Sequence, residues 1–268
     1  RRICLACAPA RWLCRLTIPA LCSATFGLTA VGAEGVRISE ANSKLRIEID
    51  GELFAEYHYE GNSRPFLYPV FGPGGLPVTR NWPMKEVEGE AQDHPHHKSL
   101  WWSHGDVNGV DFWSESSRAG KTVHERFLKI ESGEESGVIR SANKMVSRDG
   151  KVIGTDIRTM RIHSSGDAKV LDFDITVTAS EGELTFGDTK EGTMAIRLAT
   201  TMRVKGHGGP GKGMIVNSEG VRGAGAWGKR AKWVDYFGPV QGQTVGVAIF
   251  DHPDNPRFPT WWHVRDYG

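Results

Sequence analysis

The chain has no cysteine after residue 22, because Cys4, Cys7, Cys14 and Cys22 are the only four. Residues 34–268 therefore have neither disulfide bonds nor thiolate metal ligands, and their stability rests on a hydrophobic core. These roughly 235 residues are enough to bury such a core in one domain.

A surplus of either charge is also missing, with 33 Lys and Arg against 32 Asp and Glu. Because no cluster of basic residues is present, nucleic acid is not an expected partner. After residue 33 no apolar run approaches the roughly 20 residues that cross a bilayer. Hydrophobic residues make up 39% of the chain and charged residues 24%, a globular composition that excludes disordered and collagen-like chains.

The first 33 residues differ from the rest. They carry four arginines and no acidic residue, and an apolar stretch from Leu16 to Val31 ends in small residues. This order predicts a secretory signal peptide at residues 1–33, cleaved before Glu34, with an uncleaved anchor helix as the alternative. We therefore expect an exported protein, periplasmic or extracellular, without membrane attachment after cleavage. Loss of the four arginines would take the formal net charge from +1 to −3.

Beyond Glu34 the hydrophobic period is two, which is typical of strands with one buried face. Residues 171–177 alternate between apolar side chains and Asp or Thr, and residues 45–50 and 245–249 follow the same pattern. Asp149-Gly150 and residues 164–167 predict hairpin turns, and no window of 12 or more residues suggests an amphipathic helix. We expect strands near residues 36–49, 52–59, 123–131, 137–147, 151–163, 168–179, 193–204, 213–217, 231–237 and 243–250. The prediction is a single all-β domain over residues 34–268, an antiparallel β-sandwich, with a C-terminal piece expected to be missing after Gly268.

Chemically active side chains are most concentrated between Asp93 and Trp113, where four of the ten histidines fall within eleven residues. Histidine exchanges a proton near neutral pH, and an indole offers a flat face to a sugar ring. One interpretation is a polar-aromatic pocket for a sugar. A second is a metal site formed by His96, His104 and Asp106. A third is that the histidines satisfy turns while the tryptophans fill the core.

A second segment, residues 186–197, places an acidic loop between Gly187 and Gly192. Glu191 is its best candidate for a carboxylate base, because a strand mouth can partly desolvate the carboxyl and raise its pKa. Arg197 follows on the next expected strand. A solvated turn is the alternative.

Two further segments combine indoles with charged side chains. In residues 225–238, Trp233 offers a stacking surface, Lys229 a cationic donor and Asp235 a second candidate base, with cation–π packing on a strand as the alternative. In residues 250–267, three prolines force an irregular loop and His263 lies beside two tryptophans. We expect these segments to meet around one site.

Four segments together resemble a bacterial family known as PmoA-like, or methane oxygenase PmoA: DHPHHKSLWWSHGDVNGVDFW, GDTKEGTMAIR, WGKRAKWVDYFG and DHPDNPRFPTWWHVRDYG. The likeness runs from about Glu34 to the end of the chain. The family name implies a methane monooxygenase subunit, which in the membrane oxygenase is a multi-span helical protein. Residues 34–268 lack an apolar span and have a β period, so the sequence does not predict that activity.

A second likeness is to the galactose-mutarotase type of supersandwich. Residues 64–69 followed by Thr79-Arg80-Asn81 are similar to the early strand and Arg-bearing turn of those folds. In such enzymes a carboxylate removes the anomeric hydroxyl proton while a histidine protonates the ring oxygen. The resemblance implies that Arg80 holds a substrate oxygen, that His97 or His104 is the acid, and that Glu191 or Asp235 is the base. The chain lacks the second catalytic histidine followed by a late glutamate, so mutarotation itself is not implied.

The resulting prediction is an exported all-β supersandwich that performs acid/base chemistry on a sugar or polyol ring, by epimerisation, elimination or hydrolysis, without a cofactor. The expected catalytic residues are His97, His104, Glu191 and Asp235. The expected substrate-binding residues are Arg80, His96, Trp101, Asp106, Asn108, Arg197, Lys229, Trp233 and His263. The alternatives are a non-catalytic glycan-binding module and an enzyme that holds a divalent metal ion at His96, His104 and Asp106.

Overall fold

Two antiparallel β-sheets make up most of the protein. The computed structural model describes residues 2–7, 34–206 and 209–267. The larger sheet has eight strands in the order β14-β15-β16-β1-β10-β9-β8-β7, and the smaller has six in the order β11-β6-β5-β4-β3-β2. The helices among the described residues are three short 3-10 turns, η1 (Pro73–Gly75), η2 (Thr200–Met202) and η3 (Gly223–Ala226). The predicted all-β antiparallel sandwich is confirmed.

The strand bounds fix which residues share a sheet. The larger sheet consists of β14 (Met214–Asn217), β15 (Trp233–Val240), β16 (Gln243–Asp251), β1 (Arg2–Cys7), β10 (Ala168–Thr178), β9 (Val152–Ser165), β8 (Ser136–Val146) and β7 (Lys121–Glu131). The smaller sheet consists of β11 (Met194–Ile196), β6 (Leu100–Trp102), β5 (Phe66–Val70), β4 (Glu52–His58), β3 (Lys44–Ile49) and β2 (Val36–Ala41). A separate hairpin pairs β12 (Lys205–Gly206) with β13 (Gly209–Pro210).

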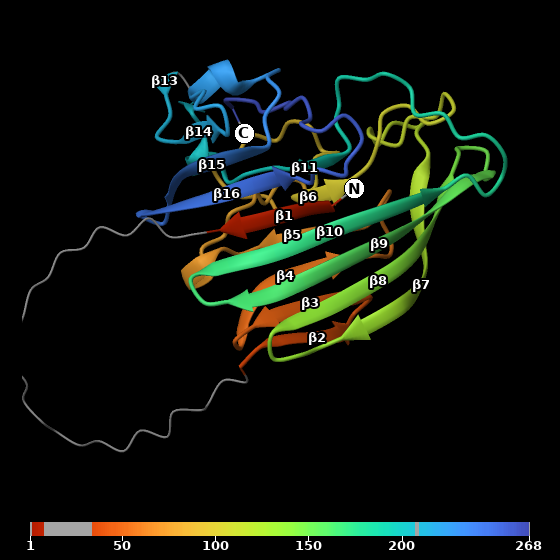
Figure 1. The fold of residues 1–268 in the computed structure, drawn as a ribbon, viewed down its shortest axis with the longest axis horizontal. Helices are drawn as coiled ribbons and strands as arrows, with labels where there is room; N and C mark the ends of the chain where they lie inside the picture. Colours follow the sequence, from red (N-terminus) through yellow and green to blue (C-terminus); the bar gives the residue numbers. More distant parts are fainter. Residues whose placement is uncertain (1, 8–33, 207–208, 268) are drawn as a thin grey trace, which may run out of the picture.

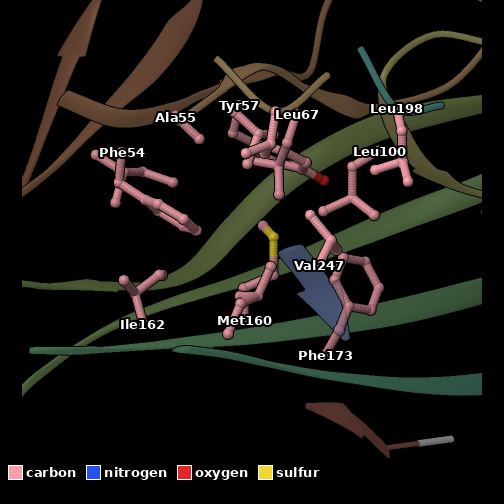
Figure 2. Close-up of a cluster of buried hydrophobic side chains, with 14 of the residues drawn as sticks. Phe54, Ala55, Tyr57, Leu67, Leu100, Met160, Ile162, Phe173, Leu198 and Val247 are labelled. Carbon is pink, nitrogen blue, oxygen red and sulfur yellow. The ribbon is translucent and has the colours of Figure 1, made fainter. Parts of the chain in front are cut away.

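The core lies between the two sheets, which pass over one another (Figure 1). Burial alternates along β9, β10 and β15, so each of these strands directs every second side chain inward. Figure 2 shows Phe54 and Tyr57 from the smaller sheet facing Met160, Ile162 and Phe173 from the larger one. Burying each such apolar side chain contributes about 1.5–3 kcal/mol, so this contact is the main driving force for the sandwich.

Most expected strands are present, and the exceptions have physical reasons. The hydrophobic period did not predict β5 or β6, because β6 is buried at all three positions and β5 contains Pro69, so neither alternates. Only the supersandwich likeness implied a strand at residues 64–69. The strand expected at 193–204 is limited to β11, since the chain turns into η2 after it. The predicted turn at Asp149-Gly150 joins β8 to β9, with Gly150 at φ 85°.

The predicted leader falls partly on a described strand. β1 pairs antiparallel with β10 on one side and with β16 on the other, and it thereby completes the larger sheet. Residues 8–33, with most of the predicted signal peptide and its cleavage position, lie outside the described residues, so export stays a prediction. Over the described ranges, no helix has the length and apolar character needed to span a bilayer.

One end of the sandwich carries the short strands and the end of the chain. β6 pairs with β11 there, with Trp101 opposite Ala195. The C-terminal segment lies near β11 and β15 (Figure 1), and a bridge between Arg230 and Trp261 holds part of it in place. This end therefore brings together residues that are far apart in the sequence.

Candidate functional site

A cavity of about 540 Å³ lies at this end, bounded by the β6–β11 pair, by strands β15 and β16 and by residues 260–265. Its size is within the range of cavities that hold small ligands. Six of the sequence-predicted site residues line it: His97, Trp101, His104, Glu191, Arg197 and His263. The cavity is thus mixed in character, with imidazoles, a carboxylate, guanidinium groups and indoles.

Aromatic packing fixes the position of His97. Its ring stacks on Trp101 with centroids 5.2 Å apart and meets the edge of Trp113 at 5.8 Å, and the two indoles are 5.2 Å apart. All three side chains are buried, because β6 directs Trp101 into a small cluster with Phe66. The imidazole is therefore held rigidly in the cavity wall.

The charge state of His97 differs from the one expected of an acid. Burial, together with the nearby His96 and Arg197, lowers the pKa of His97 to about 2. Arg197 Nη1 donates to His97 Nδ1 at 3.1 Å, so the ring proton lies on Nε2. An imidazole in this environment is neutral at physiological pH and donates a hydrogen bond without a charge. The role of imidazolium acid implied by the resemblance does not suit this residue.

Asp93 completes the electrostatics on this side of the cavity, although the sequence did not single it out. Its Oδ1 accepts from Arg197 Nη2 at 2.6 Å and lies 3.7 Å from Arg80 Nη1. Burial alone would raise the pKa of Asp93, but Arg197, His94 and Arg80 outweigh it and lower the pKa below the usual range. Asp93 is therefore an ionised anchor for Arg197.

Hydrogen bonds to residues 103–106 hold the loop of residues 187–193. His104 Nε2 donates to the Gly187 carbonyl at 3.0 Å, the Gly187 amide donates to the Asp106 carbonyl at 2.9 Å, and the Ser103 amide donates to the Thr193 carbonyl at 2.8 Å. A Cβ at Gly187 would lie 2.1 Å from Asp106 Oδ2, so the close approach requires glycine. The loop is thereby fixed at both ends, with Glu191 between them in the cavity lining.

The same contact defines the tautomer of His104. Because Nε2 donates to the Gly187 carbonyl, Nδ1 is the unprotonated nitrogen of the neutral ring. Nδ1 is buried and has no hydrogen-bond partner within the described part of the chain. His104 is therefore oriented through Nε2, and its Nδ1 is not used by any other side chain or backbone group that the structure describes.

The opposite wall is a chain of polar contacts from Glu191 to Trp227. Arg265 Nη2 donates to Glu191 Oε1 at 3.4 Å, and Arg265 Nε donates to His263 Nε2 at 2.8 Å. Trp227 Nε1 approaches His263 Nδ1 at 3.3 Å. Burial lowers the pKa of His263, and Arg265 lowers it further. A neutral imidazole has one acceptor nitrogen, so His263 accepts from only one of these two donors at a time.

Seven of the thirteen expected residues lie outside the cavity lining, and three of these come from residues 225–238. Val234 and Tyr236 line the cavity, and because side chains alternate along β15, Trp233 and Asp235 lie on its opposite face. Burial raises the pKa of Asp235, with a backbone hydrogen bond opposing it, but this carboxyl does not face the cavity. Lys229 is exposed and is not part of the lining. The structure therefore corrects the roles expected for these three residues.

Asp106 and Asn108 bind backbone instead of lining the cavity. Asp106 Oδ1 accepts from the Gly109 amide at 2.9 Å. Asn108 Nδ2 donates to the Glu183 carbonyl at 2.9 Å, and its Oδ1 accepts from the Thr185 amide at 2.7 Å. Both side chains fix loops beside the site, which corrects the expectation that they bind substrate.

Arg80 and His96 lie behind the lining. Arg80 is fully buried, and its amide donates to the Arg197 carbonyl at 3.0 Å. The His96 ring meets the edge of His97 with centroids 4.4 Å apart, and burial lowers its pKa. Both residues support cavity residues from outside, so neither is placed to make the direct substrate contact expected of it.

The alternative metal site is not assembled. Among the residues that the structure describes, no group of three His, Asp or Glu side chains is placed to hold a metal ion. His104 Nε2 is engaged by a carbonyl and Asp106 Oδ1 by an amide, so these two side chains serve the loop.

The fold and the site define an all-β sandwich with a polar-aromatic cavity at one end. A family model described as a family of unknown function, DUF6807, matches residues 44–268. The chain belongs to this family, and the cavity residues described above all lie within the matched region. No curated protein and no solved structure matches the chain.

Proposed function

We propose that the cavity binds a sugar or a related polyol and performs acid/base chemistry on it. The observation that carries the proposal is the cavity lining, in which Glu191, His104, His97, Arg197 and indole rings surround about 540 Å³. Small-molecule sites typically combine an apolar or aromatic wall with a few polar groups that fix orientation. The likeness to sugar-binding supersandwiches points to the same class of ligand.

Glu191 is the proposed base. Its side chain is 18% exposed, and Arg265 and Lys190 lie 3.4 Å and 3.8 Å from Oε1. These two cations hold the carboxyl oxygen in place, and a carboxylate is the form that accepts a proton. His104 is the proposed proton donor once its Nδ1 has taken up a proton, because Nε2–H stays bonded to the Gly187 carbonyl, and His97 supplies a neutral Nε2–H bond to a substrate oxygen. General acid–base assistance of this kind contributes about 10²–10⁴-fold in rate.

Indoles provide the ring-binding surface. Trp101 and Trp113 form part of the wall, while Trp227 and Trp261 are 41% and 63% exposed in the lining. A flat aromatic face packs against the C–H face of a sugar, and tryptophan contributes large contact area with few rotatable bonds.

The test is a panel of mono- and disaccharides incubated with the protein in D₂O and followed by ¹H NMR, which records product and solvent-proton exchange. We expect turnover of at least one sugar, and a loss of about 10²-fold or more with Glu191→Gln. Glu125→Gln is the matched control, because Glu125 lies on β7 and pairs with Lys144. Equal rates for Glu191→Gln and the unmodified protein would exclude the proposed base.

A non-catalytic glycan-binding module is the second candidate, favoured by the exposure of Trp227 and Trp261. It predicts sugar binding without product and with an affinity that is flat between pH 5 and 8. Under this alternative neither the unmodified protein nor Glu191→Gln would turn over a sugar. Trp261→Ala would weaken sugar binding.

A further inference from the structure

Three guanidinium groups are buried together on the Arg197 side of the cavity. Arg80, Arg197 and Arg203 are 0%, 3% and 7% exposed. The first two are adjacent, since the Arg80 amide donates to the Arg197 carbonyl at 3.0 Å. Burial, together with repulsion from Arg197 and Arg203, lowers the pKa of Arg80 to about 10. The three side chains therefore form one cationic cluster.

This cluster has too few acceptors of its own. Within the described ranges, Asp93 is the carboxylate at ion-pair distance, 2.6 Å from Arg197 Nη2 and 3.7 Å from Arg80 Nη1. All three guanidinium nitrogens of Arg80, together with Nε of Arg197 and Nε of Arg203, are buried without a hydrogen-bond partner in that part of the chain. Burying cationic groups without partners is costly, so the cluster is electrostatically incomplete as it stands.

The cavity is the place where a compensating charge can be added. Arg197 lines it from one wall and Arg265 from the other. Nε2 of His97 and Nε1 of Trp101 and Trp113 are buried in the same wall, also without a partner among the described residues. These groups are N–H donors, because Nδ1 of His97 already accepts from Arg197 and indole nitrogens only donate. The positive charge of Arg197 and Arg265 in the lining favours a ligand that is negative in charge.

We infer that the ligand is a sugar acid whose carboxylate binds on the Arg197–Arg265 side of the cavity. This inference rests on the proposed function and narrows it to one class of substrate. A planar carboxylate matches the fork of a guanidinium group, which is why arginine is favoured wherever carboxylates are recognised. A single hexuronate ring also suits a cavity of about 540 Å³ with indoles in its wall.

The experiment measures binding to the full chain by tryptophan fluorescence and calorimetry at constant ionic strength. The probes are D-galacturonate and D-glucuronate, their neutral partners D-galactose and D-glucose, and sodium acetate and sulfate. The variants are Arg265→Gln and Arg197→Lys, with Arg126→Gln on β7 as a charge-matched control whose side chain is 61% exposed. Arg265 is at the less buried wall, so its variant tests the inference even where Arg197→Lys impairs folding.

We expect a uronate to bind about 10- to 100-fold more tightly than its neutral partner, as hydrogen bonds to charged groups allow. Arg265→Gln should remove most of this preference for a uronate over its neutral partner, whereas Arg126→Gln should leave the preference unchanged. Equal binding of uronates and neutral sugars would overturn the sugar-acid inference and leave the proposed function standing. Acetate or sulfate binding as tightly as a uronate would also overturn it, because the site would then select charge alone. Failure of every sugar and every uronate to bind would overturn both.

Discussion

His97 shows how its surroundings change the role of a residue that the sequence selects by type. The histidine-rich segment suggested a proton donor, yet the ring is stacked on Trp101 and accepts a hydrogen bond from Arg197. The neighbouring cations cannot be inferred from spacing, because His97 and Arg197 are 100 positions apart. Its neutral state follows from the fold, and the sequence alone could not predict it.

The lowered pKa of His97 predicts a particular dependence of stability on pH. In the unfolded chain His97 is protonated below about pH 6.5, whereas in the folded protein it is protonated only near pH 2. The folded protein therefore loses stability as pH falls through this window, by about 1.4 kcal/mol per pH unit from this residue. Urea unfolding at pH 7.5, 5.5 and 4.5 measures the effect.

His97→Gln should remove that contribution, so the difference between pH 7.5 and pH 4.5 should shrink by about 2–3 kcal/mol. His252→Gln is the control, because His252 is outside the cavity lining. An identical pH slope in the unmodified protein and in His97→Gln would contradict the neutral buried imidazole.

At the scale of elements, the loop of residues 187–193 depends on a close approach of Gly187 to Asp106, in addition to the hydrogen bonds at its two ends. Gly187→Ala would place a methyl group against Asp106 and displace the loop that carries Glu191. Such overpacking costs about 1–3 kcal/mol. We expect this variant to lose ligand binding and turnover, measured by the sugar assay and by thermal unfolding.

Gly192→Ala is the matched control within the same loop, because a Cβ there would have nothing within 4 Å. It should behave like the unmodified protein. Equal activity of both alanine variants would show that the contact with Asp106 does not position Glu191.

Strand β9 carries a buried ion pair that joins the two sheets. Arg158 Nε donates to Asp156 Oδ1 at 3.0 Å, its Nη1 donates to the Pro65 carbonyl at 3.3 Å, and its guanidinium lies 5.5 Å from the centre of the Trp102 ring. Arg158→Met leaves Asp156 buried without its cation, which is expected to cost about 3–5 kcal/mol in the free energy of unfolding.

Denaturant unfolding measures this loss. Arg161→Met serves as its control, since Arg161 is on the same strand with a side chain that is 47% exposed. A loss below about 1 kcal/mol for Arg158→Met would contradict a structural role for the pair.

Strands were predictable where one face is buried and less so where both are. The alternation at residues 171–177 identified β10, whose inward positions are occupied by apolar side chains. In β15, aromatic residues occupy both faces, so the sequence does not reveal that Val234 and Tyr236 face inward. Trp233 and Asp235 were therefore expected on the cavity face of β15, whereas the residues next to them occupy that face.

At the scale of the whole molecule, residue types in the sequence indicated part of the cavity lining. They did not indicate the ion-pair partners of the lining residues. His97, Glu191 and His263 were expected from their segments, and the fold brings all three to one cavity. Asp93 and Arg265 were missed, because their importance depends on ion pairs across more than 70 positions of sequence. Such pairs are set by topology, which a single sequence does not specify.

Because β1 lies inside the larger sheet, we expect the stability of that sheet to depend on residues 2–7. β1 pairs along six residues with β10 and along four with β16. A chain that begins at Glu34 lacks this strand and exposes two unpaired edges in the middle of the sheet. We expect its thermal midpoint to fall by more than about 5 °C, measured by calorimetry.

Leu5→Pro in the full chain provides an independent check, because proline in a central strand removes a ladder hydrogen bond. It should lower the midpoint in the same direction. Unchanged midpoints in both variants would show that β10 and β16 do not need this strand.

The cavity walls come from residues near 100, near 190 and near 260, so an occupant would clamp three distant stretches of backbone at once. A ligand that binds only the folded protein raises its free energy of unfolding. The increase is about 2.7 kcal/mol when the ligand concentration is a hundred times Kd. Slower proteolysis in the presence of a compound would thus identify the natural occupant before any reaction is known.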